Sequence, residues 1–362
     1  MARMLFITAS LSFGGAAKML AFVAEAMLER GHEVHIANLL MTANVTNYER
    51  EIAANAKIYQ VGKEVGTNKL KVLKALVDIA RAVRADVVIG FTLFPNMYAS
   101  IVGKMLRIPS IMSERGDPQR TGVGRGLKGK LILDIINGCS GGVFQTEGAR
   151  SVYGQGLVRR STVIPNPIFI DDEVPFIPYE QREKSVVSVG RLDNFQKRYD
   201  VMLKAFQLFS KKHPEYVLKL YGRGNDEKQI AKWAEELCIA DKVRFMGLTT
   251  QPMKDIVGDS IFLMTSDFEG ISNALLEAMA VGLPCVSTDH SPGGARMLIQ
   301  DHNNGLLAPV EDVQKLAAAL NEFADQPELA AKCGTNAKNV VERFAPAHII
   351  DLWENYLLSF CR

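Results

Sequence analysis

Two carboxylates separated by seven residues mark the segment of this sequence best suited to chemistry. Glu269 and Glu277 lie in EGISNALLEAMAVGLP, where Gly270 can end a strand and Ser272 can cap the helix that follows. Glu269 then belongs to the loop before the helix and Glu277 to its early turns, so both can face one cleft. Amide groups at a helix start attract phosphate, and carboxylates accept hydrogen bonds from sugar hydroxyls. The segment predicts a nucleotide-sugar site; the alternative is a solvated Glu277 and a loop acid favoured by the helix dipole.

A basic pair follows the strand expected over residues 185–192. Arg191 lies at the carboxyl end of that strand, and Lys197 follows shortly after it. Arginine offers a planar fork for phosphate and lysine offers a point charge, so the pair suits a diphosphate. The alternative is that both are solvated side chains where a helix begins.

Two glycine turns give weaker signals. SFGGA (12–16), which contains Gly15, directly follows the first expected strand, where glycine lets the backbone approach a ligand. Gly222 lies in YGRG (221–224), which looks like half of a nucleotide-binding turn, but Glu227 occupies the position of the third glycine. Neither turn is the complete dinucleotide fingerprint, which argues against an NAD-binding module.

These residues must be positioned by the regular elements around them. Short apolar runs alternate with amphipathic ones, which is the pattern of a parallel sheet covered by helices. The pattern occurs in two series, one on each side of a proline-rich stretch. Strands are expected at 4–10, 32–40, 86–91 and 109–115, and then at 185–192, 216–222, 242–247, 260–266 and 284–289.

The proline-rich stretch divides the chain into domains. Four prolines between residues 161 and 184 disfavour a continuous helix or a central strand there. We expect an N-terminal domain over 1–168, a linker over 169–184, a C-terminal domain over 185–345, and a final helix over 346–362 that packs back on the N-terminal domain.

Composition excludes several classes of protein. The chain of 362 residues exceeds the usual size of one core, and its 48% hydrophobic and 23% charged residues exclude wholesale disorder. Five scattered cysteines without a C-x-x-C pair argue against a zinc site or a disulfide framework and fit a reducing compartment. No apolar run approaches the roughly 18–20 residues needed to cross a bilayer, and no secretory signal begins the chain. We expect a cytoplasmic protein.

Charge is unevenly divided between the halves. Residues 1–168 hold 21 Lys and Arg against 12 Asp and Glu, a net +9, whereas the remainder carries −7. A basic half suggests an anionic acceptor, an anionic membrane surface or nucleic acid; the alternative is a chance surface bias. The basic residues lack interleaved aromatics, which disfavours nucleic acid. They concentrate in an amphipathic helix near 69–84 and in a glycine-rich stretch over 115–130 that we expect to be a loop.

Three of these motifs together resemble a known family. The glycine turn at 14–15, Gly190-Arg191 with Lys197, and above all Glu269-x7-Glu277 are similar to motifs of the retaining glycosyltransferases of family 4, in the same order along almost the whole chain. The resemblance implies the GT-B fold, an α/β fold in which two Rossmann-like domains place parallel sheets on either side of a cleft. The N-terminal domain would bind the acceptor and the C-terminal domain the nucleotide sugar.

The resemblance also implies roles for individual residues. Glu269 would be the catalytic carboxylate, in contact with the donor sugar near the reaction centre. The donor-binding residues implied, by side chain or by backbone amide, are Gly15, Arg191, Lys197, Gly222, Ile271, Ser272, Asn273 and Glu277.

One segment departs from the common family pattern. Many members carry a histidine in the loop after the strand at 109–113, where this chain has SERGDP (113–118). This variant resembles the subgroup that assembles bacterial capsule, exopolysaccharide and lipid-linked oligosaccharide. It makes Glu114 and Arg115 candidates for binding the acceptor.

The function expected is retaining transfer of a hexose or N-acetylhexosamine from a UDP-sugar to a sugar hydroxyl of a polyprenyl-diphosphate-linked glycan. No cofactor is expected, and the absence of a D-x-D motif agrees with a metal-independent site. The partners expected are the nucleotide sugar, the lipid-linked acceptor and an anionic membrane surface, with the protein peripheral on the inner face of the cell membrane. The alternatives are a GT-B nucleotide-sugar epimerase and a non-enzymatic nucleotide-binding module.

Overall fold

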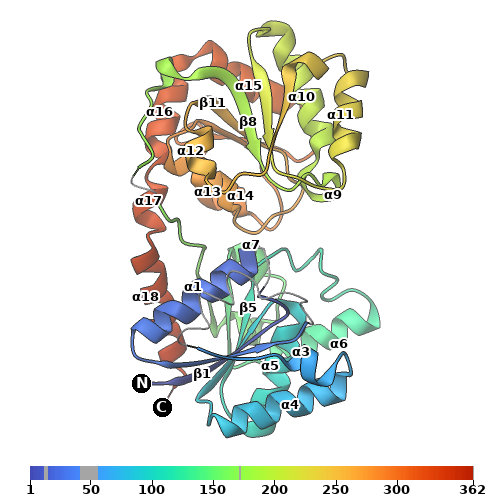
Figure 1. Cartoon of the computed structure of the whole chain (residues 1–362), viewed down its shortest axis with the longest axis vertical. Helices are drawn as coiled ribbons and strands as arrows, with labels where there is room; N and C mark the ends of the chain where they lie inside the picture. Colours follow the sequence, from blue (N-terminus) through green and yellow to red (C-terminus); the bar gives the residue numbers. More distant parts are fainter. Residues whose placement is uncertain (12–14, 41–55, 171–172, 362) are drawn as a thin grey trace. The chain divides into compact units, whose positions relative to one another are not determined.

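The computed structural model describes residues 1–11, 15–40, 56–170 and 173–361. The chain forms two compact units (Figure 1). Unit 1 comprises Met1–Asn166 together with Ala347–Arg362, and unit 2 comprises Pro167–Pro346. Most of the glycine turn expected at 12–16 lies outside the described residues; only its last two positions, beginning with Gly15, are described.

Unit 1 is built on a parallel sheet. Among the described residues it has seven strands in the order β3-β2-β1-β4-β5-β6-β7. Its strands are β1 (Arg3–Thr8), β2 (Glu33–Asn38), β3 (Lys57–Tyr59), β4 (Val87–Phe91), β5 (Ser110–Glu114), β6 (Gly141–Phe144) and β7 (Ser161–Val163). Its helices are α1 (Gly15–Glu29), α3 (Val61–Val65), α4 (Lys69–Ala82), α5 (Leu93–Leu106), α6 (Gly126–Asn137), α7 (Glu147–Arg150), α8 (Gln155–Val158) and α18 (Pro346–Leu358).

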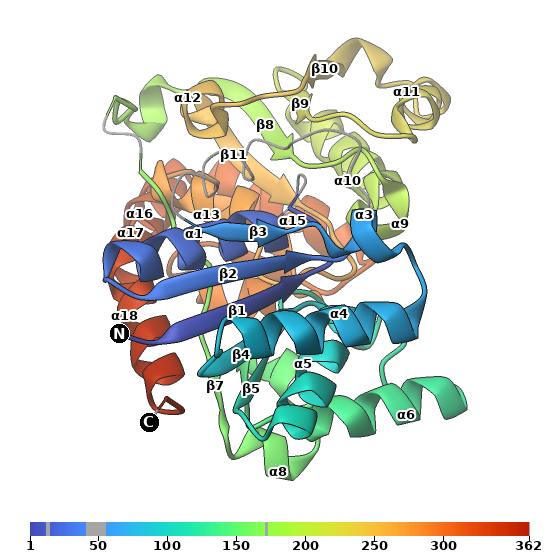
Figure 2. The same cartoon turned by 60° about the horizontal axis from the view of Figure 1, so that its bottom comes forward.

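Apolar side chains of β1 point alternately to the two faces of the unit 1 sheet, and both faces are buried. Leu5 and Ile7 pack in a cluster with Leu76 of α4 and Val102 of α5. Phe6 points to the opposite face, as expected for a strand with a two-residue repeat, and contacts Phe91. In Figure 2, α4, α5 and α6 lie together beside the strands of this unit.

The C-terminal helix α18 belongs to unit 1. Trp353 is fully buried and stacks on Phe91 with a centroid distance of 5.7 Å. Glu354 accepts a hydrogen bond from His32 at 2.9 Å and pairs with Arg30 at the end of α1. Figures 1 and 2 both show α18 beside α1. Ring stacking and ion pairs therefore hold the last helix against the first domain of the chain.

The expectation of a loop over 115–130 is wrong for its last part, because α6 begins at Gly126. Gly122 and Gly124, before the helix, and Gly126, its first residue, have positive φ and turn the chain into α6. Gly129 then lies inside the helix, where a Cβ would overlap the carbonyl oxygen of Gly122. Here glycine serves close backbone packing, so a glycine-rich composition does not indicate a loop.

Unit 2 also contains a parallel sheet. Its six described strands have the order β10-β9-β8-β11-β12-β13. They are β8 (Glu183–Val189), β9 (Val217–Tyr221), β10 (Val243–Gly247), β11 (Asp259–Met264), β12 (Cys285–Thr288) and β13 (Leu306–Ala308). The helices are α9 (Asn194–Lys197), α10 (Tyr199–Lys212), α11 (Glu227–Glu236), α12 (Pro252–Ile256), α13 (Asn273–Ala280), α14 (Gly294–Leu298), α15 (Val313–Asp325), α16 (Pro327–Ala337) and α17 (Val340–Arg343), with single 3-10 turns at Tyr179–Gln181 and Ala240–Lys242.

Strand order determines where a ligand can bind in unit 2. The chain proceeds from β8 outward through β9 to β10, and then begins again on the other side with β11 and proceeds to β13. The loops after β8 and β11 therefore diverge at the carboxyl edge of the sheet. Open α/β sheets bind ligands at this kind of switch point. The two motifs richest in charged residues, after β8 and after β11, lie at this point.

Candidate functional site

The turn after β8 is held rigidly by its own side chains. Asp193 caps α9 and accepts a hydrogen bond from the Phe195 amide at 3.1 Å. Asp226 accepts one from the Asn194 amide at 2.7 Å. Arg198 then adopts a left-handed conformation with φ of 53°, which ends α9 and begins α10. The sharp turn leaves Lys197 directed toward the loop after β11.

Backbone contacts join this turn to the loop after β11. The Asp267 amide donates to the carbonyl oxygen of Gln196 at 3.0 Å, and the Thr265 hydroxyl donates to that of Lys197 at 2.8 Å. The Gln196 side chain donates to the carbonyl oxygen of Phe268 at 3.1 Å. The two loops thus form one unit at the switch point.

Lys197 and Glu269 contact each other directly. The distance between Lys197 Nζ and Glu269 Oε2 is 2.7 Å, and the two side chains are only 14% and 18% exposed. The same carboxylate oxygen accepts hydrogen bonds from Gln196 at 3.3 Å and from the Ser266 hydroxyl at 3.2 Å. The residue expected to bind the diphosphate, Lys197, therefore lies next to the residue expected to contact the donor sugar, Glu269. A nucleotide sugar has its diphosphate bonded directly to its sugar, so its binding site needs these two residues to be neighbours.

Arg191 lies at the more exposed side of the same network. Its guanidinium is 3.1 Å from Asp193 and 3.4 Å from the side-chain oxygen of Gln196, and its side chain is 66% exposed. An exposed ion pair of this kind stabilises the fold by at most about 1 kcal/mol. Arg191 can therefore exchange this partner for a phosphate at low cost.

Helix α13 begins beside Glu269. Ser272 is its N-cap and accepts a hydrogen bond from the Leu275 amide at 3.4 Å. The side chain of Ile271 is buried, so only its backbone could face a ligand. Glu277 is half-buried in the second turn of α13. The N-terminus of α13 therefore directly follows the loop that carries Glu269, the partner of Lys197.

Sequence reasoning missed the part played by the segment after β12. The Glu269 amide donates to the carbonyl oxygen of Ser291 at 2.8 Å. A Cβ on Gly294 would overlap the carbonyl oxygen of Gly270, so only glycine allows this crossing of the two loops. His290 is 1% exposed, and burial lowers the pKa of its imidazole. A P-G-G run after a strand was the available signal for so close an approach.

Gly222 has a structural reason to be glycine. Its φ is 134°, and a Cβ would overlap the carbonyl oxygen of Gly190. The Gly190 amide in turn donates to the carbonyl oxygen of Tyr221 at 2.9 Å. The turns after β8 and β9 therefore pack backbone against backbone. A contact between Gly222 and the donor stays a prediction.

Glu114 and Arg115 are embedded in unit 1. Glu114 is 3% exposed, and it accepts hydrogen bonds from the Tyr153 hydroxyl at 2.9 Å and from the amides of Arg115 and Gly116. Burial raises the pKa of Glu114. The Arg115 guanidinium donates to Asn166 and lies 6.0 Å from the ring centroid of Trp353. These contacts favour a structural role for both residues, and their contact with an acceptor stays a prediction.

Gly15 is the first residue of α1 and is exposed. It follows β1, which neighbours β4 at the switch point of the unit 1 sheet. Its expected approach to the donor diphosphate stays a prediction.

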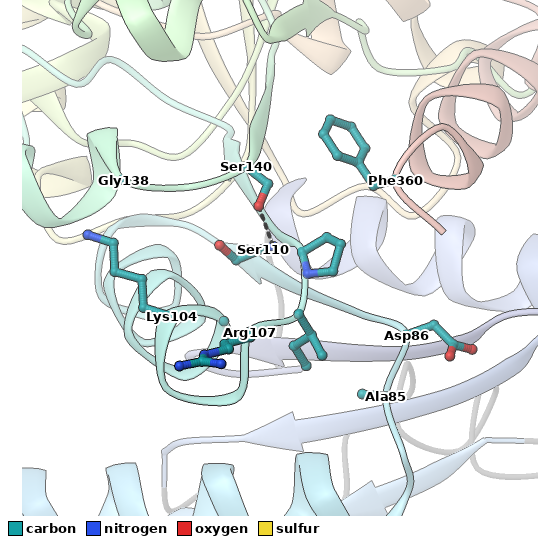
Figure 3. Close-up of a pocket in the computed structure, with 11 residues that line it drawn as sticks. Ala85, Asp86, Lys104, Arg107, Ser110, Gly138, Ser140 and Phe360 are labelled. Carbon is teal, nitrogen blue, oxygen red and sulfur yellow. Dashed lines mark hydrogen bonds between the residues drawn. The ribbon is translucent and has the colours of Figure 1, made fainter. Parts of the chain in front are cut away.

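A cavity of about 570 Å³ opens at the amino-terminal edge of the unit 1 sheet, where β4, β5 and β6 begin (Figure 3). Lys104 and Arg107 line one side of it, and Phe360 lies across from them. Both basic residues lie at or near the C-terminal end of α5, and Lys104 extends over Gly138, where α6 ends. Cations at helix C-termini balance the helix dipole. The basic lining of this cavity therefore has a structural explanation.

Comparison with protein families identifies the chain. The model described as Glycosyltransferase Family 4 matches residues 13–172, and the model described as Glycosyl transferases group 1 matches residues 171–340. The chain belongs to the family 4 glycosyltransferases. An uncharacterized glycosyltransferase of Haemophilus influenzae is 25% identical over 352 residues, which cover 96% of this chain and 97% of that protein.

A second relative carries a more specific name. The enzyme of Campylobacter jejuni named GalNAc-alpha-(1->4)-GalNAc-alpha-(1->3)-diNAcBac-PP-undecaprenol alpha-1,4-N-acetyl-D-galactosaminyltransferase is 26% identical over 362 residues, covering 98% of this chain and 97% of the enzyme. Among solved structures, Anabaena HepE in complex with UDP superimposes with a TM-score of 0.83 at 17% identity, covering 99% of this chain and 100% of HepE. The predicted fold class, two Rossmann-like α/β domains of the GT-B type, is confirmed.

Neither a membrane-spanning helix nor a cluster of metal ligands occurs among the described residues of the glycosyltransferase. No helix there is long and apolar enough to cross a membrane. No group of three or more His, Cys, Asp or Glu side chains in that part is placed to hold a metal ion. Metal independence stays a prediction.

The Lys197–Glu269 network leads to a first expected result. Lys197→Ala should weaken UDP binding by about 2–3 kcal/mol, because a largely buried ammonium forms a charge-assisted hydrogen bond to phosphate. Arg191→Ala should cost less, about 1 kcal/mol, since its side chain is mostly in solvent. Calorimetric titration with UDP measures both, and Lys212→Ala, which removes an exposed lysine of unit 2, serves as the control. Unchanged UDP affinity in both site variants would remove these residues from the donor site.

Proposed function

We propose that the enzyme transfers a hexose or N-acetylhexosamine from a UDP-sugar to a sugar hydroxyl of a polyprenyl-diphosphate-linked glycan, with retention of configuration. The reaction would serve the assembly of a bacterial surface polysaccharide or glycan on the cytoplasmic face of the cell membrane. The observation that carries the proposal is the direct contact of Lys197 with Glu269 at the switch point of unit 2. It joins a phosphate-binding cation to a sugar-binding carboxylate within one rigid pair of loops.

The reaction breaks the bond between the anomeric carbon and the diphosphate. Negative charge develops on the departing UDP, and Lys197 and Arg191 stabilise it. The acceptor oxygen attacks from the face that UDP leaves, and its proton passes to the departing phosphate. Glu269 orients the donor sugar by accepting a hydrogen bond from a hydroxyl, and its charge favours the positive character of the anomeric carbon. Retention follows from departure and attack on one face.

Named relatives and neighbours support the choice of donor and acceptor. The solved HepE structures contain UDP, UDP with glucose, and UDP-glucose. Two Campylobacter jejuni relatives are named as N-acetylgalactosaminyltransferases acting on undecaprenyl-diphosphate-linked sugars. A Staphylococcus aureus relative is named as an N-acetylglucosaminyltransferase that acts on poly(ribitol-phosphate). These names favour an N-acetylhexosamine or hexose donor carried on UDP.

The test is release of UDP from a panel of four donors, UDP-glucose, UDP-galactose, UDP-N-acetylglucosamine and UDP-N-acetylgalactosamine. We expect release from one of them to rise when a polyprenyl-diphosphate-linked oligosaccharide is added, and to be unchanged by EDTA. Mass spectrometry should show the acceptor heavier by one sugar residue. Conversion of one UDP-sugar into another without an acceptor would indicate an epimerase, and UDP binding without turnover would indicate a binding module.

The two basic segments expected to contact a membrane lie on α4 and around the start of α6. Leu76, Val77 and Ala80 of α4 are buried in the core, so most of the apolar stripe of that helix faces inward, although Leu70 is 79% exposed. Helix α6 buries Ile136 but also carries two exposed leucines. Leu127 is 91% exposed and Leu131 61% exposed. They alternate with exposed basic side chains, at Arg125, Lys128 and Lys130.

We propose that α6 and the first turn of α4 contact an anionic membrane. The enzyme should bind vesicles that contain phosphatidylglycerol and not vesicles of phosphatidylcholine alone. Combined reversal at Lys128 and Lys130 should weaken binding by about tenfold or more, because each basic residue near an anionic surface contributes about 1 kcal/mol. Reversal at Lys69, Lys71 and Lys74 should also weaken it, and high salt should abolish it. Vesicle co-sedimentation measures these effects.

The control is reversal of Lys211 and Lys212, an exposed lysine pair at the end of α10 in unit 2. Leu127→Ser with Leu131→Ser separates insertion of apolar side chains from charge attraction. Equal binding to both kinds of vesicle would contradict the proposal, and so would the same loss of binding in the control variant.

A further inference from the structure

An aromatic pair, the exposed Phe195 and the half-buried Phe268, borders the Lys197–Glu269 network. Phe195 of α9 is 73% exposed, although α9 is otherwise anchored by hydrogen bonds. Its ring packs edge-on against Phe268, with a centroid distance of 5.5 Å and an interplanar angle of 69°. Phe268 directly precedes Glu269, and Phe195 directly precedes Gln196, which donates to both Phe268 and Glu269. The two rings therefore come from the two loops that meet at the switch point.

Packing between the two rings does not explain why Phe195 is held at an exposed position. The edge contact between the two rings stabilises the fold only modestly, and most of the surface of Phe195 remains in water. An isolated exposed apolar residue needs no explanation, but this one lies beside a buried ion pair at the edge where ligands bind. Its position offers a flat apolar face to whatever approaches Glu269.

The surroundings of Phe195 select among possible ligands. Its neighbours in the chain, Asp193, Asn194 and Gln196, are all polar, so the apolar surface that α9 offers is the ring of Phe195. A lipid chain or a protein interface needs a wider apolar patch. A pyranose ring has C–H groups on its faces and hydroxyls around its edge, and aromatic side chains with a few placed polar groups are the usual composition of sites for such ligands.

We propose that Phe195 and Phe268 form a carbohydrate subsite that stacks the terminal sugar of the acceptor against the donor site. The proposal rests on the proposed function and names the part of unit 2 that receives the acceptor. The acceptor sugar, rather than the donor sugar, is assigned here because Phe195 is open to solvent, whereas Lys197 and Glu269 are largely enclosed. The Gln196 side-chain amide donates to the carbonyl oxygen of Phe268 and to the carboxylate of Glu269, and so connects the aromatic pair to the enclosed network.

Two variants test the subsite. Phe195→Ala should raise the KM for the acceptor by at least about tenfold, since it removes the stacking face, and Phe195→Tyr should restore it to within about threefold. The KM for the UDP-sugar and the Kd for UDP should stay unchanged in both variants. Acceptors are the methyl glycosides of glucose, galactose, N-acetylglucosamine and N-acetylgalactosamine, which lack any lipid. Phe176→Ala is the matched control, because Phe176 is a 60% exposed phenylalanine of unit 2 outside this network.

Binding without turnover gives a second measurement. Calorimetry of the UDP-saturated enzyme with the same methyl glycosides should show saturable binding to wild type and the Phe176 variant, and none to Phe195→Ala. An unchanged acceptor KM in Phe195→Ala overturns the subsite. A change confined to the donor KM also overturns it, because the ring would then contact the donor sugar. Absence of UDP binding by the wild type would instead contradict the proposed function.

Discussion

Glu269→Gln should lower kcat by about 100-fold or more at saturating UDP-sugar, while the Kd for UDP stays the same or falls. Removing one preorganised electrostatic group from a reaction centre costs about 10²–10³ in kcat. Glutamine keeps the size of the side chain and can still accept hydrogen bonds from Gln196 and Ser266, so the loop should keep its conformation. The loss of charge also releases Lys197 from its 2.7 Å ion pair and leaves it available to the diphosphate.

A fall in kcat without weaker UDP binding makes this result distinctive. A variant that merely disturbed the loop would weaken UDP binding and lower turnover together. Glu277→Gln provides the comparison, because Glu277 is half-buried on α13 and is expected to bind the nucleotide. It should weaken UDP binding and leave kcat at saturating donor near the wild-type value. Normal turnover by Glu269→Gln at saturating donor would remove Glu269 from the reaction centre.

Trp353→Ala should destabilise unit 1 by about 3–5 kcal/mol, the usual cost of removing a large buried aromatic side chain. Trp353 is fully buried, stacks on Phe91 with an interplanar angle of 13°, and lies under the Arg115 guanidinium. Its loss would leave a cavity between α18 and the carboxyl end of β4. Urea denaturation followed by circular dichroism measures the change in the free energy of unfolding.

Two further variants on α18 show whether the loss of stability comes from the buried aromatic ring of Trp353. Trp353→Phe should cost much less, because phenylalanine keeps the stack and removes an indole N–H that has no hydrogen-bond partner among the described residues. Leu352→Ala, a neighbouring and partly exposed position on α18, should cost less than about 1 kcal/mol. If Trp353→Ala unfolds at the same urea concentration as wild type, α18 does not stabilise unit 1.

Local signals in the sequence were sufficient for the elements and for the family. The strand expected at 260–266 is β11 (Asp259–Met264), and the helix expected after Ser272 is α13. These predictions depend on side-chain periodicity and on capping, which involve neighbouring residues only. The same reasoning failed over 126–130, where α6 begins, because Gly129 is a glycine for the sake of a close backbone contact with Gly122 inside the fold, which does not require a loop.

Contacts between distant residues were decided by the tertiary structure alone. The resemblance made Glu114 a candidate for binding the acceptor, and only the structure shows that Tyr153, 39 residues later, supplies a hydrogen bond to the buried carboxylate. The close approach of Gly222 to the backbone of Gly190, which also requires a glycine there, is likewise visible only in the structure. The solvation of a carboxylate depends on which donors surround it in space, and no local pattern specifies them.

The sequence by itself determined which residues could bind a nucleotide sugar, because phosphate and hydroxyl recognition require particular side chains at strand ends and helix starts. It specified Arg191, Lys197, Glu269 and Glu277 on these grounds. Only the tertiary structure decided that Lys197 pairs with Glu269, that Gln196 links the pair to Arg191, and that Phe195 borders them. The reason is the order of the strands. In the chain, 69 residues lie between the end of β8 at Val189 and the start of β11 at Asp259. The two strands are nevertheless neighbours in the sheet, and the loops after them meet only because the sheet places these strands side by side.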